Sequence, residues 1–168
     1  LRQMLRRAVL ELTGPVAVRY PRGGEGAYQG CCGSETFTQV RSGADCTILT
    51  YGVLINEALA AAELLHQVGI EARVMKLNAI APLHNDEVLA ALGAEKRLLV
   101  LEDCMGSGCV GQRLTAILAQ QGWMPERLIL KNLGGTIPCH GSVPQLYAQM
   151  GLDAASVAKV LKEVCHEQ

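Results

Sequence analysis

The sequence predicts an α/β fold, a three-layer α/β/α arrangement with a mostly parallel five-stranded sheet. From residue 37 onward, short apolar runs of strand length alternate with longer runs that have helical periodicity. Hydrophobic residues make up 49% and charged residues only 18% of the chain, which is typical of strands covered on both faces. Because repeated strand-helix-strand units require right-handed crossovers, most of these strands are expected to be parallel.

The first part of the chain differs from the rest. Apolar residues on one helical face predict a helix over Leu1–Leu12, which Gly14-Pro15 ends, and a short strand follows at Val16–Arg19. The glycines and the proline of the following stretch, from Tyr20 to about Ser34, indicate a linker. We therefore predict that residues 1–34 are the end of another domain plus this linker, and that residues 35–168 form the α/β domain. A chain that opens with leucine inside a helix is expected to be a piece of a longer protein.

Each later element follows from a local pattern. Apolar runs predict the five strands, of which the first can be an antiparallel edge strand: Phe37–Arg41, Cys46–Tyr51, Ala72–Leu77, Arg97–Leu101 and Leu128–Asn132. Helical periodicity predicts five helices: Ile55–Gln67, Asn85–Leu92, Gly111–Gln121, Ser142–Gln149 and Asp153–Val164. Ser142 and Asp153 are favourable N-cap residues, and Gly151 suits a C-cap.

Charge and cysteine content exclude several classes of protein. The formal net charge is -1, and apart from Arg6-Arg7 no basic run stands out, so neither nucleic acid nor an anionic membrane is an expected partner. No apolar stretch is long enough for a membrane span, and we expect a cytoplasmic protein. The seven cysteines fit neither a disulfide framework nor paired zinc ligands, so they are expected to be reduced thiols.

One motif suggests a nucleotide site. Residues 106–111 read G-x-G-x-x-G between a strand and a helix, which is the context of a dinucleotide-binding loop. However, Glu102 and Asp103 place like charge beside the expected pyrophosphate, and the next strand ends in Lys131-Asn132 without an acid for the ribose. We therefore expect these glycines to allow close packing of helix on strand, and the two acids to contact a neighbouring domain. A stand-alone nucleotide-binding or interaction module stays the alternative.

Several segments resemble one enzyme family. The run Gly14–Gly23, G-P-V-A-V-R-Y-P-R-G, resembles the segment that closes the central, pyrimidine-binding domain of 1-deoxy-D-xylulose-5-phosphate synthases of the transketolase class. Ile48–Leu64 resembles the first strand and helix of their C-terminal domain. Shorter matches are Ile80–Leu83, Leu101–Asp103, His140–Ser142 and Gly151–Ala154. The chain departs from the family pattern at Asn78, where arginine is frequent, and at Cys104.

The resemblance implies a function for a longer protein. These synthases use thiamine diphosphate and Mg²⁺ to condense pyruvate with glyceraldehyde 3-phosphate, with loss of CO₂, for isoprenoid and thiamine biosynthesis. Arg22 matches the family's ligand for the substrate phosphate, and a guanidinium can grip two phosphate oxygens at once. The cofactor and metal motifs are expected in polypeptide outside this chain, which would be inactive alone and would pack against the rest of a homodimer. The alternative is a separate subunit of a split transketolase or 2-oxoacid dehydrogenase.

The remaining reactive side chains are expected to be structural. His84 follows a turn and can cap a helix, whereas His140 beside Cys139 lacks further metal ligands at a usable spacing. Cys104 and Cys109 are expected to be inert thiols. Arg19 is expected to form a structural ion pair. Two further histidines are expected to be solvated: His66 and His166. The sequence thus predicts no catalytic, cofactor-binding or metal-binding residue in this chain.

Overall fold

The computed structural model describes residues 1–168 except 22, 25, 31–34, 94 and 167–168. Its sheet has five strands in the order β1-β3-β2-β4-β5. The strands are β1 (Phe37–Arg41), β2 (Cys46–Tyr51), β3 (Ala72–Leu77), β4 (Arg97–Leu101) and β5 (Arg127–Lys131). The edge strand β1 pairs antiparallel with β3, and every other pair is parallel. The predicted mostly parallel sheet and its antiparallel edge are confirmed.

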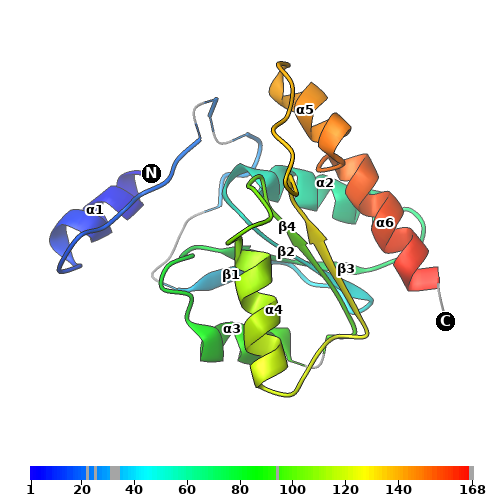
Figure 1. Ribbon diagram of the computed structural model, residues 1–168, viewed down its shortest axis with the longest axis horizontal. Coiled ribbons are helices and arrows are strands. Elements are labelled where there is room, and N and C mark those ends of the chain that lie inside the picture. Colours follow the sequence, from blue (N-terminus) through cyan, green and yellow to red (C-terminus); the bar gives the residue numbers. More distant parts are fainter. Residues whose placement is uncertain (22, 25, 31–34, 94, 167–168) are drawn as a thin grey trace.

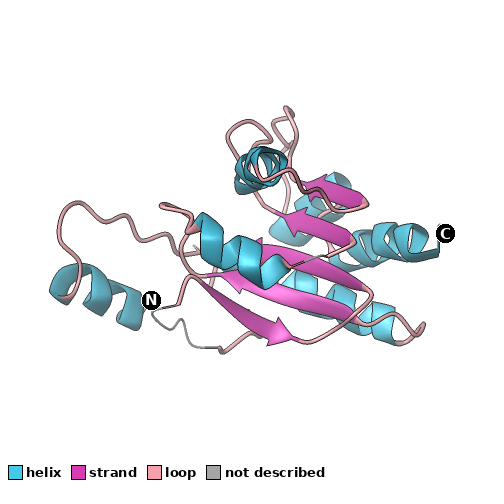
Figure 2. Ribbon diagram, turned by 90° about the horizontal axis from the view of Figure 1, so that it is seen from below, coloured by secondary structure: helices cyan, strands magenta, loops and turns pink. Residues whose placement is uncertain are grey.

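Helices cover both faces of the sheet (Figures 1 and 2). The helices of the described chain are α1 (Arg2–Leu10), α2 (Ile55–His66), α3 (Asn85–Leu92), α4 (Val110–Gln120), α5 (Val143–Met150) and α6 (Ala154–His166), with a 3-10 turn, η1 (Gly52–Leu54), before α2. Helices α2 and α6 pack on one face, and α3 and α4 on the other. The predicted three layers are therefore confirmed.

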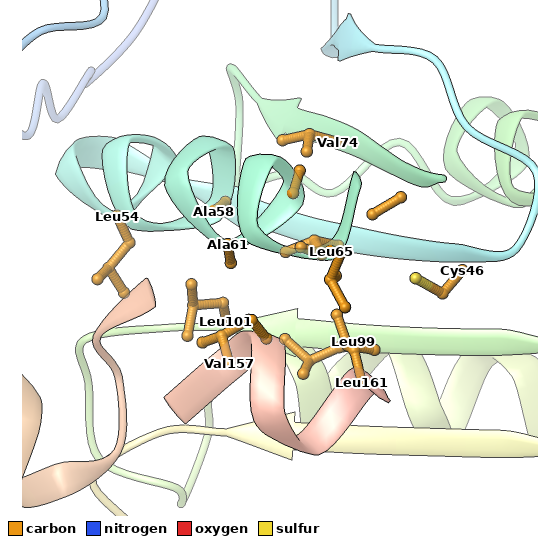
Figure 3. Close-up of a cluster of buried hydrophobic side chains, with 14 of the residues drawn as sticks. Cys46, Leu54, Ala58, Ala61, Leu65, Val74, Leu99, Leu101, Val157 and Leu161 are labelled. Atoms are coloured by element: carbon orange, nitrogen blue, oxygen red, sulfur yellow. The ribbon is translucent and has the colours of Figure 1, made fainter. Parts of the chain in front are cut away.

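Two apolar cores hold the layers together. In the first, shown in Figure 3, small residues of α2 allow α6 to approach closely, and Val157 and Leu161 of α6 fill the space above the sheet. Strand β2 contributes Ile48 to this core and its neighbour Leu49 to the opposite one. Since successive strand side chains point to opposite faces, a strand buried on both faces shows no regular alternation of apolar and polar residues, and in β2 the two threonines are buried as well. This burial explains why the boundaries of β2 could be predicted from its sequence.

The N-terminal segment lies outside these layers. Helix α1 contains no buried residue and lies apart from the sheet in Figure 1. The strand predicted at Val16–Arg19 is wrong, because that segment has no strand structure and pairs with no described strand. A strand needs a partner for its backbone hydrogen bonds, and four residues cannot supply one. The domain boundary at residue 34 stays a prediction.

Helix ends depend on both local and distant residues. Ser142 and Gln145 form the capping box of α5, and Gly151 ends that helix in the left-handed conformation, both as predicted. Asp153 stands before α6, and its carbonyl oxygen accepts from the Val157 N–H at 3.0 Å. The first N–H of α6, that of Ala154, donates to a carboxylate 97 residues away, Glu57 Oε2, at 2.8 Å. Among the described helices, none combines the length and apolar character needed to cross a membrane.

Candidate functional site

A crevice lined partly by polar side chains lies at the carboxyl ends of β2 and β4. The chain leaves β2 toward β3 on one side and reaches β4 on the other, so the order of strands reverses between β2 and β4. In open α/β sheets such a reversal leaves a crevice outside the carboxyl ends of the strands. A cavity of about 380 Å³ lies here, and its lining includes Arg19, Tyr51, Cys104, Cys109 and Arg113.

A buried carboxylate lies behind this crevice and bonds to two of the residues that line it, Tyr51 and Val110. Glu102, which directly follows β4, is only 1% exposed. Its Oε1 accepts from the Val110 N–H at 2.8 Å and its Oε2 from the Gly111 N–H at 2.9 Å. The Tyr51 hydroxyl donates to Oε1 at 3.0 Å. These amides belong to the first turn of α4, so Glu102 satisfies donors that the helix itself leaves unpaired and places negative charge at the positive end of the helix dipole.

Because of this arrangement, the glycine-rich loop of residues 106–111 offers no free helix N-terminus to a pyrophosphate. The amides at the start of α4, which a dinucleotide would need, already bind Glu102. A Cβ at position 111 would lie 2.9 Å from Glu102 Oε2 and 2.9 Å from Leu130 Cδ2, so only glycine fits between helix and strand. The geometry agrees with close packing of helix on strand and speaks against the nucleotide-binding alternative.

The thiols at the crevice are poor nucleophiles. Burial raises the pKa of the Cys104 thiol and of the Cys109 thiol, and the nearby Glu102 charge raises both pKa values further. Burial also raises the pKa of Tyr51, whose hydroxyl lies 3.6 Å from Cys104 Sγ. Thiols held in the protonated state react slowly. The two cysteines therefore fit the inert role expected for them.

The arginine predicted to bind phosphate, Arg22, lies outside the described residues. Arg19, three positions earlier, is exposed and lines the cavity, but no described carboxylate lies within ion-pair distance of it. The ion pair expected for Arg19 therefore stays a prediction. Arg113 Nη1 donates to the Ile80 carbonyl oxygen at 2.9 Å, and this bond ties α4 to the turn after β3.

A second polar cluster lies at the carboxyl end of β3. The side chain of Lys76 is buried, and its Nζ donates to Asn78 Oδ1 at 2.9 Å. Asn78 Nδ2 in turn donates to Thr38 Oγ1 at 2.8 Å. Lys76 Nζ also lies 5.7 Å from the centre of the Tyr28 ring. No sequence pattern identified this cluster, because its members come from the linker and two different strands.

The histidines offer no metal centre. In the part of the chain that the structure describes, no group of three or more His, Cys, Asp or Glu side chains could hold a metal ion. His140 is exposed, and His84 is the N-cap residue of α3 as expected, although its side chain makes no capping hydrogen bond. His66 is exposed as expected, and its Nδ1 lies 2.6 Å from Glu71 Oε1.

Comparison with protein families finds one match. The model described as "Transketolase, C-terminal domain" matches residues 36–157. Among solved structures, the chain resembles a split gene transketolase described as an inactive beta4 tetramer, with a TM-score of 0.65 and 22% identity over 77% of this chain and 41% of that one. It also resembles transketolase from Pichia stipitis, with a TM-score of 0.59 and 17% identity over 79% of this chain and 18% of that one. At these identities the structures show the fold alone.

Curated relatives share more sequence. The 1-deoxy-D-xylulose-5-phosphate synthase of Heliobacterium modesticaldum is 33% identical over 176 residues, which cover 98% of this chain and 26% of the relative. A protein of the same name from Thermus thermophilus is 36% identical over 167 residues, covering 96% of this chain and 26% of the relative. The chain thus spans about a quarter of the length of these relatives, and the predicted resemblance to the synthases is confirmed.

Proposed function

Because this chain belongs to the family of transketolase C-terminal domains, we propose that it is the C-terminal part of a 1-deoxy-D-xylulose-5-phosphate synthase. The observation that supports this proposal is the similarity to synthases along nearly the whole chain, including the segment before the family domain begins at residue 36. The G-P-V-A-V-R-Y-P-R-G run lies in that earlier segment.

The proposed reaction belongs to the whole enzyme. Pyruvate loses its carboxylate as CO₂, and the remaining two-carbon unit forms a carbon–carbon bond to the aldehyde carbon of glyceraldehyde 3-phosphate, with uptake of one proton. The product feeds isoprenoid and thiamine biosynthesis, and we place the enzyme in the cytoplasm. Thiamine diphosphate and Mg²⁺ would supply the carbanion chemistry. The described residues of this chain do not fit either group, since they form no metal-ligand cluster and the amides at the start of α4 are already bonded.

The proposed contribution of this chain is substrate phosphate binding, domain packing and dimerisation. Residues 20–25, here called the arginine loop, include Arg22, which would bind the phosphate of glyceraldehyde 3-phosphate. A guanidinium provides a planar fork of donors for phosphate oxygens. Holding that remote phosphate would also align the aldehyde for attack, which lowers the entropic part of the barrier. The exposed apolar side chains of α1, such as Leu5 and Val9, would pack against the rest of the polypeptide.

The test uses Arg22→Ala in the complete enzyme. Loss of a charge-assisted phosphate contact, worth about 1.5–3 kcal/mol, is expected to raise the KM for glyceraldehyde 3-phosphate by roughly 10- to 150-fold. The KM for pyruvate, which has no phosphate, is expected to change less than twofold. Arg41→Ala is the control, because Arg41 lies on β1 in a surface ion pair with Glu63. Equal effects of Arg22→Ala on both substrates would reject the phosphate role.

The gene supplies an independent test. If the reading frame continues upstream of Leu1 and encodes a G-D-G cofactor motif, the chain is part of one synthase polypeptide. A separate start codon immediately upstream would instead indicate a subunit of a split transketolase or 2-oxoacid dehydrogenase.

A further inference from the structure

The linker after the arginine loop is held on the α/β domain by a specific side chain. The Tyr28 N–H donates to Asn56 Oδ1 at 2.9 Å, across 28 positions of sequence. Asn56 Nδ2 donates to the Val53 carbonyl oxygen of η1 at 2.8 Å. Because the amide nitrogen donates to a carbonyl oxygen, the orientation of the amide is fixed and its oxygen is left to accept from the Tyr28 N–H. The first turn of α2 therefore presents an oriented acceptor to the Tyr28 backbone.

The backbone at Gly26 passes close to the Asn56 side chain, so a residue with a Cβ there would have to displace that side chain. A Cβ at position 26 would lie 2.5 Å from Asn56 Nδ2, well inside van der Waals contact. The φ angle of Gly26 is +75°, a conformation that L side chains rarely adopt. Gly24 has a similar φ of +97°, but nothing lies within 4 Å of a Cβ there. Of these two glycines, only Gly26 makes a close approach to Asn56.

The ring of Tyr28 adds a second contact. Lys76 Nζ lies 5.7 Å from the ring centre, within the range of a cation–π interaction. The Lys76 residue is 7% exposed, and its Nζ also donates to Asn78 Oδ1 at 2.9 Å. Such contacts are stronger when the cation is shielded from water. Tyr28 is therefore held through its backbone by α2 and through its ring by β3.

We propose that Asn56, Lys76 and Asn78 are positioning residues for the arginine loop, through the linker seat that they form for residues 26–28. This inference rests on the proposed function of Arg22. The seat holds residues 26–28, which directly follow the arginine loop in the sequence. Arg19, before the loop, lines the cavity at the ends of β2 and β4. The residues just before and just after the arginine loop thus lie against the α/β domain. We infer that these two contacts restrict the loop and so position Arg22 for phosphate binding.

The first experiment measures the seat itself in the full 168-residue chain. Asn56→Ala removes the acceptor, and Gly26→Ala forces the linker away, so the Tyr28 amide is expected to exchange its hydrogen at least about fivefold faster, the effect of losing one net hydrogen bond. Asn56→Asp keeps an acceptor oxygen and is expected to retain protection. Gly24→Ala is the matched control, because it carries the same backbone strain without the contact. Unchanged exchange in Asn56→Ala would overturn the seat.

The second experiment measures positioning in the complete enzyme. Asn56→Ala and Lys76→Met are expected to raise the KM for glyceraldehyde 3-phosphate about fivefold, with kcat and the KM for pyruvate within twofold. Asn56→Asp is expected to restore most of the affinity. If Tyr28 loses protection but the KM for glyceraldehyde 3-phosphate is unchanged, the positioning role is wrong. The phosphate role itself is tested separately by the effect of Arg22→Ala on the two KM values. If that test fails while Tyr28 still loses protection in Asn56→Ala, the linker seat is a structural contact without a role in substrate binding.

Discussion

Removing the Glu102 carboxylate is predicted to destabilise the domain strongly. In Glu102→Ala the N–H groups of Val110 and Gly111 lose their acceptor at buried positions. Each buried donor left unsatisfied costs about 1–3 kcal/mol, so the two together predict a loss of roughly 2–6 kcal/mol in the free energy of unfolding. Domains of this size are stable by only about 5–15 kcal/mol, so the variant is expected to be near the limit of folding.

The measurement is urea unfolding followed by far-UV circular dichroism, with the midpoint shifted and the slope unchanged. Glu102→Gln separates hydrogen bonding from cavity formation, since it keeps the volume but offers one acceptor atom instead of two. It is expected to lose about 1–3 kcal/mol. The adjacent Asp103 is the control, because it is exposed and its side chain accepts only a long hydrogen bond from the Tyr147 hydroxyl, at 3.5 Å, among the described residues. Asp103→Ala is expected to change stability by less than about 0.5 kcal/mol. If Glu102→Ala behaved like this control, the capping argument would be refuted.

Two further predictions follow from packing and burial. Gly111→Ala would place a Cβ 2.9 Å from Leu130 Cδ2 and is expected to destabilise by about 1–3 kcal/mol in urea unfolding, whereas Gly135→Ala, with nothing within 4 Å, should have little effect. Burial and then the Asp103 charge raise the pKa of Tyr147 from 10.0 to about 12, so Tyr147→Phe should remove one phenolate absorbance step centred near that pH. Because the pKa of Tyr147 is higher in the folded than in the unfolded state, the neutral hydroxyl stabilises the fold below about pH 10, and this contribution is lost as the pH rises toward 12. The Tyr147→Phe variant should not show this loss of stability. A phenolate titration that is unchanged in the variant would contradict the assignment.

Elements buried on both faces could be predicted from sequence with their boundaries. The mostly apolar runs Cys46–Tyr51 and Arg97–Leu101 coincide with β2 and β4, since burial on both faces leaves no regular alternation of apolar and polar residues. The short Val16–Arg19 segment has a similar composition but forms no strand. Its apolar residues have no partner strand among the described residues, and composition alone cannot reveal whether one is available.

The candidate site was predictable only in part. The acid pair after β4 and the glycines of residues 106–111 drew attention from sequence, and like charge argued against a nucleotide. The hydrogen bonds that Glu102 accepts from the start of α4 could not be foreseen from the sequence. Glutamate side chains are exposed far more often than buried, and Gly111, one of the two donors, lies nine positions away in the sequence. Asn56 and Lys76 carried no signal at all.

By itself the sequence determined the layers, the strand directions and the family, because periodic burial of apolar side chains is a local property that each segment carries. Tertiary structure alone decided the partners of the polar groups: Glu102 with α4, Glu57 with α6, and Asn56 with the linker. Apolar burial is non-directional and tolerates many neighbours, whereas a hydrogen bond requires a particular donor and acceptor within about 3 Å, and those positions exist only once the chain has folded.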